Sequence, residues 1–136
     1  MPGVLVDASG LIALLDRDDA AHERTVDAVK GIRGALSTVW PALTEAMHLL
    51  ADIPRAADAL CDMVSDEALV MLDLEAADMA RMKVLMQKYR DLPMDFADAA
   101  LVRAAERERI TRIVTLNRHF HVYRLPRRAR FAVLPS

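Results

Sequence analysis

The sequence predicts an α/β fold, a three-layer α/β/α sandwich in which helices cover both faces of a parallel sheet of about five strands. Short apolar runs alternate with helical patterns along the whole chain, the order typical of βαβ units. The run 4–6 is apolar at every position, which indicates a strand buried on both faces. A length of 136 residues suits one domain, which we expect to span 1–136 because no linker or repeat divides it.

Composition and the first residues favour a compact soluble protein. Hydrophobic residues make up 54% of the chain and charged residues 28%, which is enough apolar surface for a sizeable core. No apolar run is long enough to cross a bilayer, and Met1-Pro2-Gly3 leads into a strand without a signal sequence. We therefore expect a cytoplasmic protein with no membrane contact. The lone Cys61 excludes an internal disulfide, and its apolar helical neighbours predict a buried thiol.

Apolar runs and prolines define the elements of the first half. The first strand ends at Asp7, and the small residues that follow turn the chain into a brief helix. Pro41 and Pro54 each suit the first turn of a helix. We expect strands over 3–7 and 35–40, and helices over 11–16, 21–32, 41–51 and 54–65.

The second half continues the same alternation. A third apolar run predicts a strand, and methionines at helical spacing predict a helix whose apolar stripe is core or partner-binding surface. Asp95 and Asp98 begin the following helix. The last strand is predicted at an edge of the sheet because Pro126 and Pro135 bound it. We expect strands over 68–74, 112–116 and 129–134, and helices over 75–89 and 95–107.

Acidic residues recur where strands end or helices begin. Asp7 closes the first strand, and Glu45 lies in the helix after the second. Asp95 and Asp98 point the same way because positions three apart share one helix face. Asp-x-x-Asp at a helix start is also an N-cap with an acid at N3, and that plain interpretation stays open. Asn117 follows the fourth strand. Because the carboxyl ends of parallel strands share one edge, these side chains are expected to converge.

Such a group of carboxylates favours a divalent cation. Four carboxylates repel and raise one another's pKa unless a cation lies between them. Oxygen ligands favour Mg²⁺ or Mn²⁺ over Zn²⁺. A phosphodiester is the natural substrate, since such ions activate water and stabilise the leaving oxygen. His48, which forms Glu-x-x-His with Glu45, and the pair His119 and His121 are expected to be ordinary residues rather than ligands.

The C-terminal end of the chain is rich in arginine. No acidic residue follows Glu108, whereas seven arginines do. Bidentate contacts to the phosphates of a polyanion would explain them, and a merely solvated basic surface would explain them equally well. These residues are Arg109, Arg112, Arg118, Arg124, Arg127, Arg128 and Arg130.

Four segments resemble, in this order, the motifs of the PIN-domain nucleases. They are Val-Asp7-Ala-Ser9-Gly, Glu45 within its helix, Asp95-Phe-Ala-Asp98-Ala, and Thr115-Leu-Asn117-Arg-His-Phe120. The short chain further resembles the VapC-type toxins of toxin–antitoxin pairs. This resemblance implies a PIN-like fold and a Mg²⁺- or Mn²⁺-dependent endoribonuclease that hydrolyses RNA. It also implies a homodimer, which forms a higher assembly with a small inhibitory cognate antitoxin.

The resemblance assigns roles to the acids. Asp7 and Asp95 match the positions most often treated as direct metal ligands. Glu45 and Asp98 match the acids that complete the site, directly or through water. The resemblance therefore implies that these four residues bind the metal and carry catalysis.

Further positions match the same motifs. Ser9 and Thr115 match hydroxyls that orient Asp7 and the substrate phosphate. Asn117 matches a catalytic position at which many relatives have Asp. Its amide keeps an acceptor oxygen but removes a negative charge. The loss of this charge disfavours a second metal site more than the first. Residues that would contact RNA phosphates, or equally a partner, are Arg118, Arg124, Arg127 and Arg128.

Two other functions stay open. A PIN-fold module that binds RNA or antitoxin, with weak or no catalysis, is supported by Asn117. A phosphatase using Asp7 as its nucleophile is disfavoured, because those enzymes usually carry a second acid where this chain has Ser9.

Overall fold

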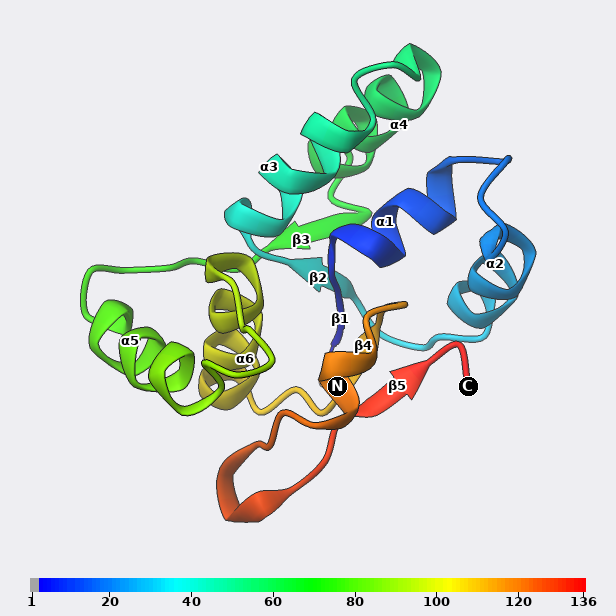
Figure 1. Ribbon diagram of the computed structural model, residues 1–136. Coiled ribbons are helices and arrows are strands. Elements are labelled where there is room, and N and C mark those ends of the chain that lie inside the picture. Colours follow the sequence, from blue (N-terminus) through cyan, green and yellow to red (C-terminus); the bar gives the residue numbers. More distant parts are fainter. Residues whose placement is uncertain (1–2) are drawn as a thin grey trace.

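A single parallel sheet organises the molecule. The computed structural model describes residues 3–136; Met1 and Pro2, part of the segment in which no signal sequence is predicted, lie outside this range. Within it, every strand pairing is parallel and the strand order is β3-β2-β1-β4-β5 (Figure 1). The strands are β1 (Val4–Val6), β2 (Leu36–Thr38), β3 (Leu69–Met71), β4 (Arg112–Val114) and β5 (Ala132–Leu134).

Helices connect the strands and cover the sheet. In Figure 1, α5 and α6 lie to one side, α3 and α4 extend at the top, and α2 lies beside α1 on the other side. The helices are α1 (Ala8–Leu15), α2 (His22–Lys30), α3 (Trp40–Leu49), α4 (Pro54–Ser65), α5 (Asp78–Lys88) and α6 (Phe96–Glu108), followed by the short 3-10 helices η1 (Arg118–His121) and η2 (Pro126–Arg128).

Two apolar cores lie on opposite faces of the sheet. On one face, Leu5 and Ile113 pack with buried residues of α5 and α6. On the other face, Val4, Val6 and Val114 pack with residues of α1, α3 and α4. Because alternate residues of a strand point to opposite faces, β1 is buried on both. The predicted three-layer α/β/α fold is therefore confirmed.

Several boundaries differ from the prediction. Each strand has only three residues. α1 begins at Ala8 rather than after Gly10, because Asp7 supplies its N-cap. Trp40, expected to end the second strand, is instead the first residue of α3. The last strand lies at an edge of the sheet, as predicted.

The prediction of a buried thiol at Cys61 is wrong. Cys61 lies on α4 with an exposed side chain. α4 instead buries Ala56 and Leu60, which are four positions apart and share one face of the helix. Cys61 follows Leu60 directly and so points about a quarter of a turn away from that face.

No helix within residues 3–136 has both the length and the apolar character needed to cross a membrane.

Candidate active site

Asp7 lies at the carboxyl edge of the sheet, where β1 passes into α1. The Gly10 N–H and the Ser9 hydroxyl donate to its Oδ1 at 2.9 and 2.7 Å, and the Thr115 hydroxyl donates to its Oδ2. The side chain is buried, and this burial raises the pKa of Asp7 although all three donors oppose the shift. Both carboxylate oxygens are therefore held in one orientation.

The loop after β4 is tied to the first turn of α1. Ser9 Oγ accepts a hydrogen bond from the Leu116 N–H at 2.9 Å. Thr115 Oγ1, which donates to Asp7, also accepts from the Asn117 N–H at 2.9 Å. Ser9 and Thr115 thus orient Asp7 and at the same time join two segments that are far apart in the sequence.

Asp95 and Asp98 lie at the start of α6, where the capping interpretation of their spacing also applies. Asp95 is the N-cap, and its Oδ1 accepts from the Asp98 N–H at 2.8 Å. Asp95 remains exposed, whereas Asp98 is buried. Capping uses the backbone N–H of Asp98, so its carboxylate is available for another role.

Tyr123 is a site residue that the sequence reasoning missed. Its hydroxyl donates to Asp98 Oδ2 at 3.0 Å, and its side chain is fully buried. The aromatic rings of Tyr89 and Phe120 pack edge-on against it, each with a centroid distance of 5.0 Å. The only signal in the sequence was an aromatic residue six positions after Asn117, beyond the quoted motif that ends at Phe120.

The predicted acids gather in one small cleft. Asp7, Glu45, Asp95 and Asp98 line a cleft of about 170 Å³, together with Asn117. Glu45 reaches it from α3 with an exposed side chain. Ser9 also lines this cleft, whereas Thr115 contacts Asp7 from outside its lining. Within residues 3–136, no lysine, arginine or histidine lines this cleft. His48, His119 and His121 therefore lie outside it, and that they do not bind a metal stays a prediction.

The acids raise one another's pKa. Burial raises the pKa of Asp98 to about 7, and the negative charge of Asp95 adds to the effect. Burial followed by the charges of Asp95 and Asp7 also raises the pKa of Glu45. Charges that repel in a cleft without a basic partner are the arrangement that a cation would stabilise.

The donor atoms fit a hard divalent cation. Carboxylate oxygens are the ligands that Mg²⁺ and Mn²⁺ prefer, and Asp7 is already fixed in orientation by its three donors. Within residues 3–136, no three acidic, histidine or cysteine side chains meet closely enough to form a finished metal site. The acidic side chains are therefore neighbours that would have to move closer to one another to bind an ion.

Comparison with known proteins identifies the family. A family model described as "PIN domain" matches residues 4–125. The chain belongs to the PIN domain family. This PIN domain is 28% identical to "Ribonuclease VapC26" of Mycobacterium tuberculosis (strain ATCC 25618 / H37Rv), over 97% of this chain and 100% of that protein.

Solved structures share the fold of this PIN domain. VapC20 of Mycobacterium tuberculosis, described as a Sarcin-Ricin loop cleaving toxin, has a TM-score of 0.78 at 18% identity, covering 85% of this chain and 91% of its own. VapBC2 from Rickettsia felis, bound to a promoter DNA fragment, has a TM-score of 0.65 at 12% identity, with coverages of 96% and 97%. DNA-bound VapBC from Salmonella typhimurium has a TM-score of 0.61 at 18% identity, with 98% of both chains covered.

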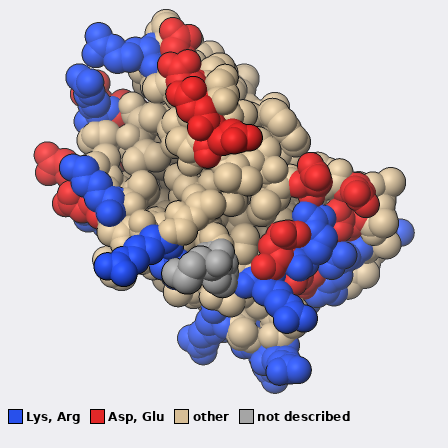
Figure 2. Space-filling model, turned by 180° about the vertical axis from the view of Figure 1, so that it is seen from behind, with Lys and Arg blue, Asp and Glu red and all other residues tan. Residues whose placement is uncertain are grey.

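The candidate RNA-binding arginines of this PIN domain occupy different places. Arg118 begins η1, next to Asn117. The Arg124 guanidinium donates hydrogen bonds to the carbonyl oxygens of His121 and Val122, at 2.8 and 2.7 Å. Arg127 and its neighbour Arg128 lie in η2. Figure 2 shows positive side chains at the lower end of the molecule, where Figure 1 draws the loop between β4 and β5.

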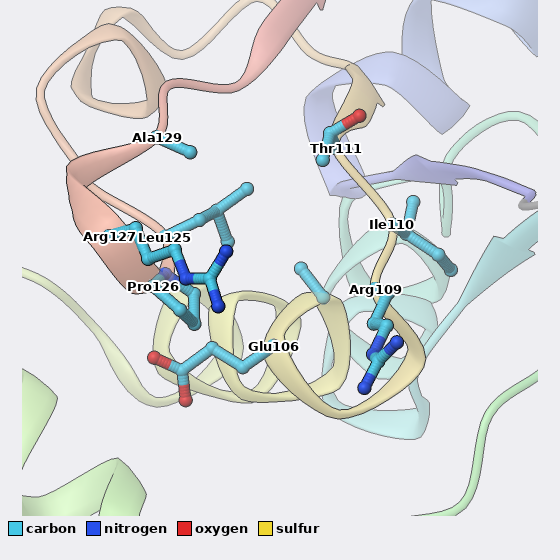
Figure 3. A pocket seen from close by; sticks show the side chains of 9 residues that line it. Glu106, Arg109, Ile110, Thr111, Leu125, Pro126, Arg127 and Ala129 are labelled. Carbon is cyan, nitrogen blue, oxygen red and sulfur yellow. The ribbon is translucent and has the colours of Figure 1, made fainter.

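Arg127 faces a hollow at the far end of α6. Asp95 is the N-cap of α6 and Arg109 is its C-cap, so a helix about 20 Å long separates them. The hollow there has a volume of about 510 Å³, and Figure 3 shows Arg109 and Arg127 on opposite sides of it. Arg127 is thus remote from the acidic cleft, whereas Arg118 is close to it.

Proposed function

We propose that this PIN domain is a Mg²⁺- or Mn²⁺-dependent endoribonuclease that acts in the cytoplasm as the toxin of a toxin–antitoxin module. The observation that carries the proposal is the convergence of Asp7, Glu45, Asp95 and Asp98 on one cleft whose lining contains no basic residue. Similarity to a protein named Ribonuclease VapC26 over nearly the whole chain supports RNA as the substrate.

The acids would hold the ion and the substrate phosphate would lie beside it. A divalent cation supplies Lewis acidity, which promotes attack by water on phosphorus and stabilises the charge on the leaving oxygen. Asp7 and Asp95 would bind the ion directly, and Glu45 and Asp98 would complete its surroundings. Ser9 and Thr115 keep Asp7 from rotating, so less ordering is required when the ion binds.

The proposed partners are a small cognate antitoxin and a second copy of this chain. The two VapBC structures with the same fold, each described as a complex bound to DNA, support an antitoxin partner. We expect a homodimer that forms a higher assembly with the antitoxin.

Cleavage of a labelled RNA by the purified, antitoxin-free protein tests the proposal. Asp7→Asn and Asp95→Asn should each lower the rate by more than about 100-fold, because losing a ligand costs more than the 10- to 100-fold loss typical of groups that only support one. Asp58→Asn, which removes an exposed acid on α4, should cleave normally. Cleavage that persists in excess EDTA, or that is unchanged in the two site variants, would refute the proposal.

A binding module without catalysis is the second candidate, and Asn117 favours it. The Asn117 Oδ1 accepts from the His119 N–H at 3.0 Å and caps η1, so this oxygen is already engaged. In this case the antitoxin-free protein would shift RNA on a gel in Mg²⁺ or Mn²⁺ and leave it uncut.

A further inference from the structure

We infer that Arg24 and Arg118 form a binding site for a phosphate of the RNA strand, immediately beside the acidic cleft. The inference rests on the proposed function, because it extends the same site toward its substrate. Arg24 was not a candidate from the sequence, since it lies in α2, far along the chain from Asn117.

A second hollow adjoins the acidic cleft. It has a volume of about 280 Å³, and its lining includes Arg24, Arg118 and His121. Asn117 lines both this hollow and the acidic cleft, so the two meet at that residue. In the described part of the chain, no acidic residue lines this second hollow. Negative and positive side chains are therefore separated across Asn117.

This separation suits a polyanion that also needs a cation. A phosphate being cleaved would lie at the acids with the metal ion. The neighbouring phosphates of the same strand would then lie within reach of side chains at the rim of the cleft. An arginine fits a phosphate because its planar fork offers two parallel hydrogen bonds.

The two arginines are carried by well-anchored segments. Arg118 opens η1, which Asn117 caps at its start and whose last carbonyl, that of His121, accepts from Arg124. Arg24 lies in the first turn of α2. The His22 ring contacts the Ala13 carbonyl of α1 through Nδ1 at 2.7 Å, which fixes the start of α2 against α1.

Neither arginine is engaged elsewhere in the described chain. Arg103 and Arg107 bind Asp78 at 2.8 and 2.7 Å, which leaves them little freedom to bind a ligand. By contrast, Arg24 and Arg118 have exposed side chains and form no ion pair within residues 3–136. Their charges are therefore available to an anion.

RNA binding can be measured without cleavage in the Asp7→Asn protein. Fluorescence anisotropy with a short labelled single-stranded RNA in Mg²⁺, between about 50 and about 200 mM KCl, gives the affinity and its salt dependence. Adding Arg24→Gln and Arg118→Gln together should weaken binding and reduce the slope of log K against log salt by at least about 0.7, the contribution of one phosphate contact to a single strand.

A charge-matched pair controls for general attraction. Arg33 and Arg109 are exposed and precede β2 and β4, so they lie at the opposite edge of the sheet from the cleft. The pair Arg33→Gln and Arg109→Gln should leave the slope unchanged. An equal loss in both pairs, no change in the first pair, or no measurable RNA binding would each overturn the inference.

The outcome is separable from that of the nuclease proposal. If the native protein fails to cut RNA but binding still depends on Arg24 and Arg118, the phosphate site stands and the proposed nuclease function fails. If the native protein cuts RNA and the double substitution changes neither binding nor KM, the phosphate site alone is refuted.

Discussion

Tyr123, a residue outside the predicted motifs, affects both the orientation and the pKa of Asp98, a candidate metal ligand. Its hydroxyl fixes Asp98 Oδ2 and leaves Oδ1 without this restraint. The hydrogen bond lowers the pKa of Asp98, against the burial and the Asp95 charge that raise it to about 7. Tyr123 therefore acts on Asp98 as a positioning residue that keeps more of the carboxylate ionised near neutral pH.

Tyr123→Phe should weaken Mn²⁺ binding by about 10-fold near neutral pH, in the range typical of losing a group that supports a ligand. The substitution retains the ring packing but removes the donor, so the pKa of Asp98 should rise further and binding should require a higher pH. Isothermal titration calorimetry across the pH range around the Asp98 pKa of about 7 would measure both effects.

Tyr89→Phe is the matched control for this experiment. The Tyr89 hydroxyl accepts from the Arg124 N–H at 3.0 Å and, within residues 3–136, forms no hydrogen bond with an acidic side chain. The control should leave the Mn²⁺ affinity unchanged. Equal loss in both variants would show that the effect of Tyr123→Phe does not come from its hydrogen bond to Asp98.

Residues that follow a local pattern could be predicted, and those that meet only in the fold could not. Asp7, Asp95 and Asp98 were found because a strand end or a helix start marks each of them. Tyr123 is 25 positions from Asp98, and no periodicity links the two. Arg24 likewise lines the same hollow as Asn117 because α2 packs against α1.

At the scale of the element, α1 depends on a close approach to the sheet. A Cβ added at Gly10 would lie 2.5 Å from the Val114 carbonyl oxygen and 2.8 Å from Val6 Cγ2. Glycine therefore allows the first turn of α1 to lie directly on β1 and β4. That position brings Asp7 and Ser9 within reach of Thr115.

Gly10→Ala should destabilise the protein by about 1–3 kcal/mol, the usual cost of overpacking. The clash involves a backbone carbonyl, which cannot rotate away, so it should outweigh the roughly 1 kcal/mol by which alanine favours a helix. Urea denaturation followed by circular dichroism would measure the change in the free energy of unfolding.

Gly31→Ala provides the contrast. Its added Cβ would have no neighbour closer than 3.6 Å, and the φ angle of Gly31 is −83°, which alanine adopts without strain. This substitution should be neutral or stabilising by up to about 1 kcal/mol. Similar effects of the two alanines on stability would refute the proposed close packing of α1.

For the whole molecule, the sequence predicted the kinds of element but not their order in space. Alternating strands and helices indicated a parallel sheet with the last strand at an edge, and both features were confirmed. The order β3-β2-β1-β4-β5 depends on long-range pairs such as Leu5 with Ile113. Local propensity carries no information about such pairs.

The group of raised carboxyl pKa values should make the metal-free protein less stable as the pH rises. An unfolded chain releases the Asp98 proton near the ordinary pKa of 3.8, whereas the folded protein keeps it until about 7. Between these values the folded state holds more protons, so its stability falls as the pH rises through this window. A difference of one pKa unit corresponds to about 1.4 kcal/mol, so the titration of Asp98 lowers the free energy of unfolding by at most about 4 kcal/mol across this window.

Urea denaturation at several pH values in EDTA would test this expectation. The raised pKa values of Asp7 and Glu45 act in the same direction. A hydrogen bond from the Glu75 N–H and the side chain of Arg103 lower the pKa of Asp78. Asp78 therefore changes the stability only at pH values below its ordinary pKa of 3.8. Asp98→Asn should flatten the dependence, and Mn²⁺ should restore stability to the native protein above pH 7. A native protein that gains stability between pH 4 and pH 7 would contradict the assignment.

The hydrogen bond from Thr115 to Asp7 joins residues 108 positions apart. During synthesis, Asp7 leaves the ribosome long before Thr115 does. Strand β1 likewise emerges long before β4, the strand with which it pairs. Unfinished or truncated chains therefore lack the assembled cleft. The proposed ribonuclease activity would therefore arise only after the chain has been synthesised at least as far as Thr115.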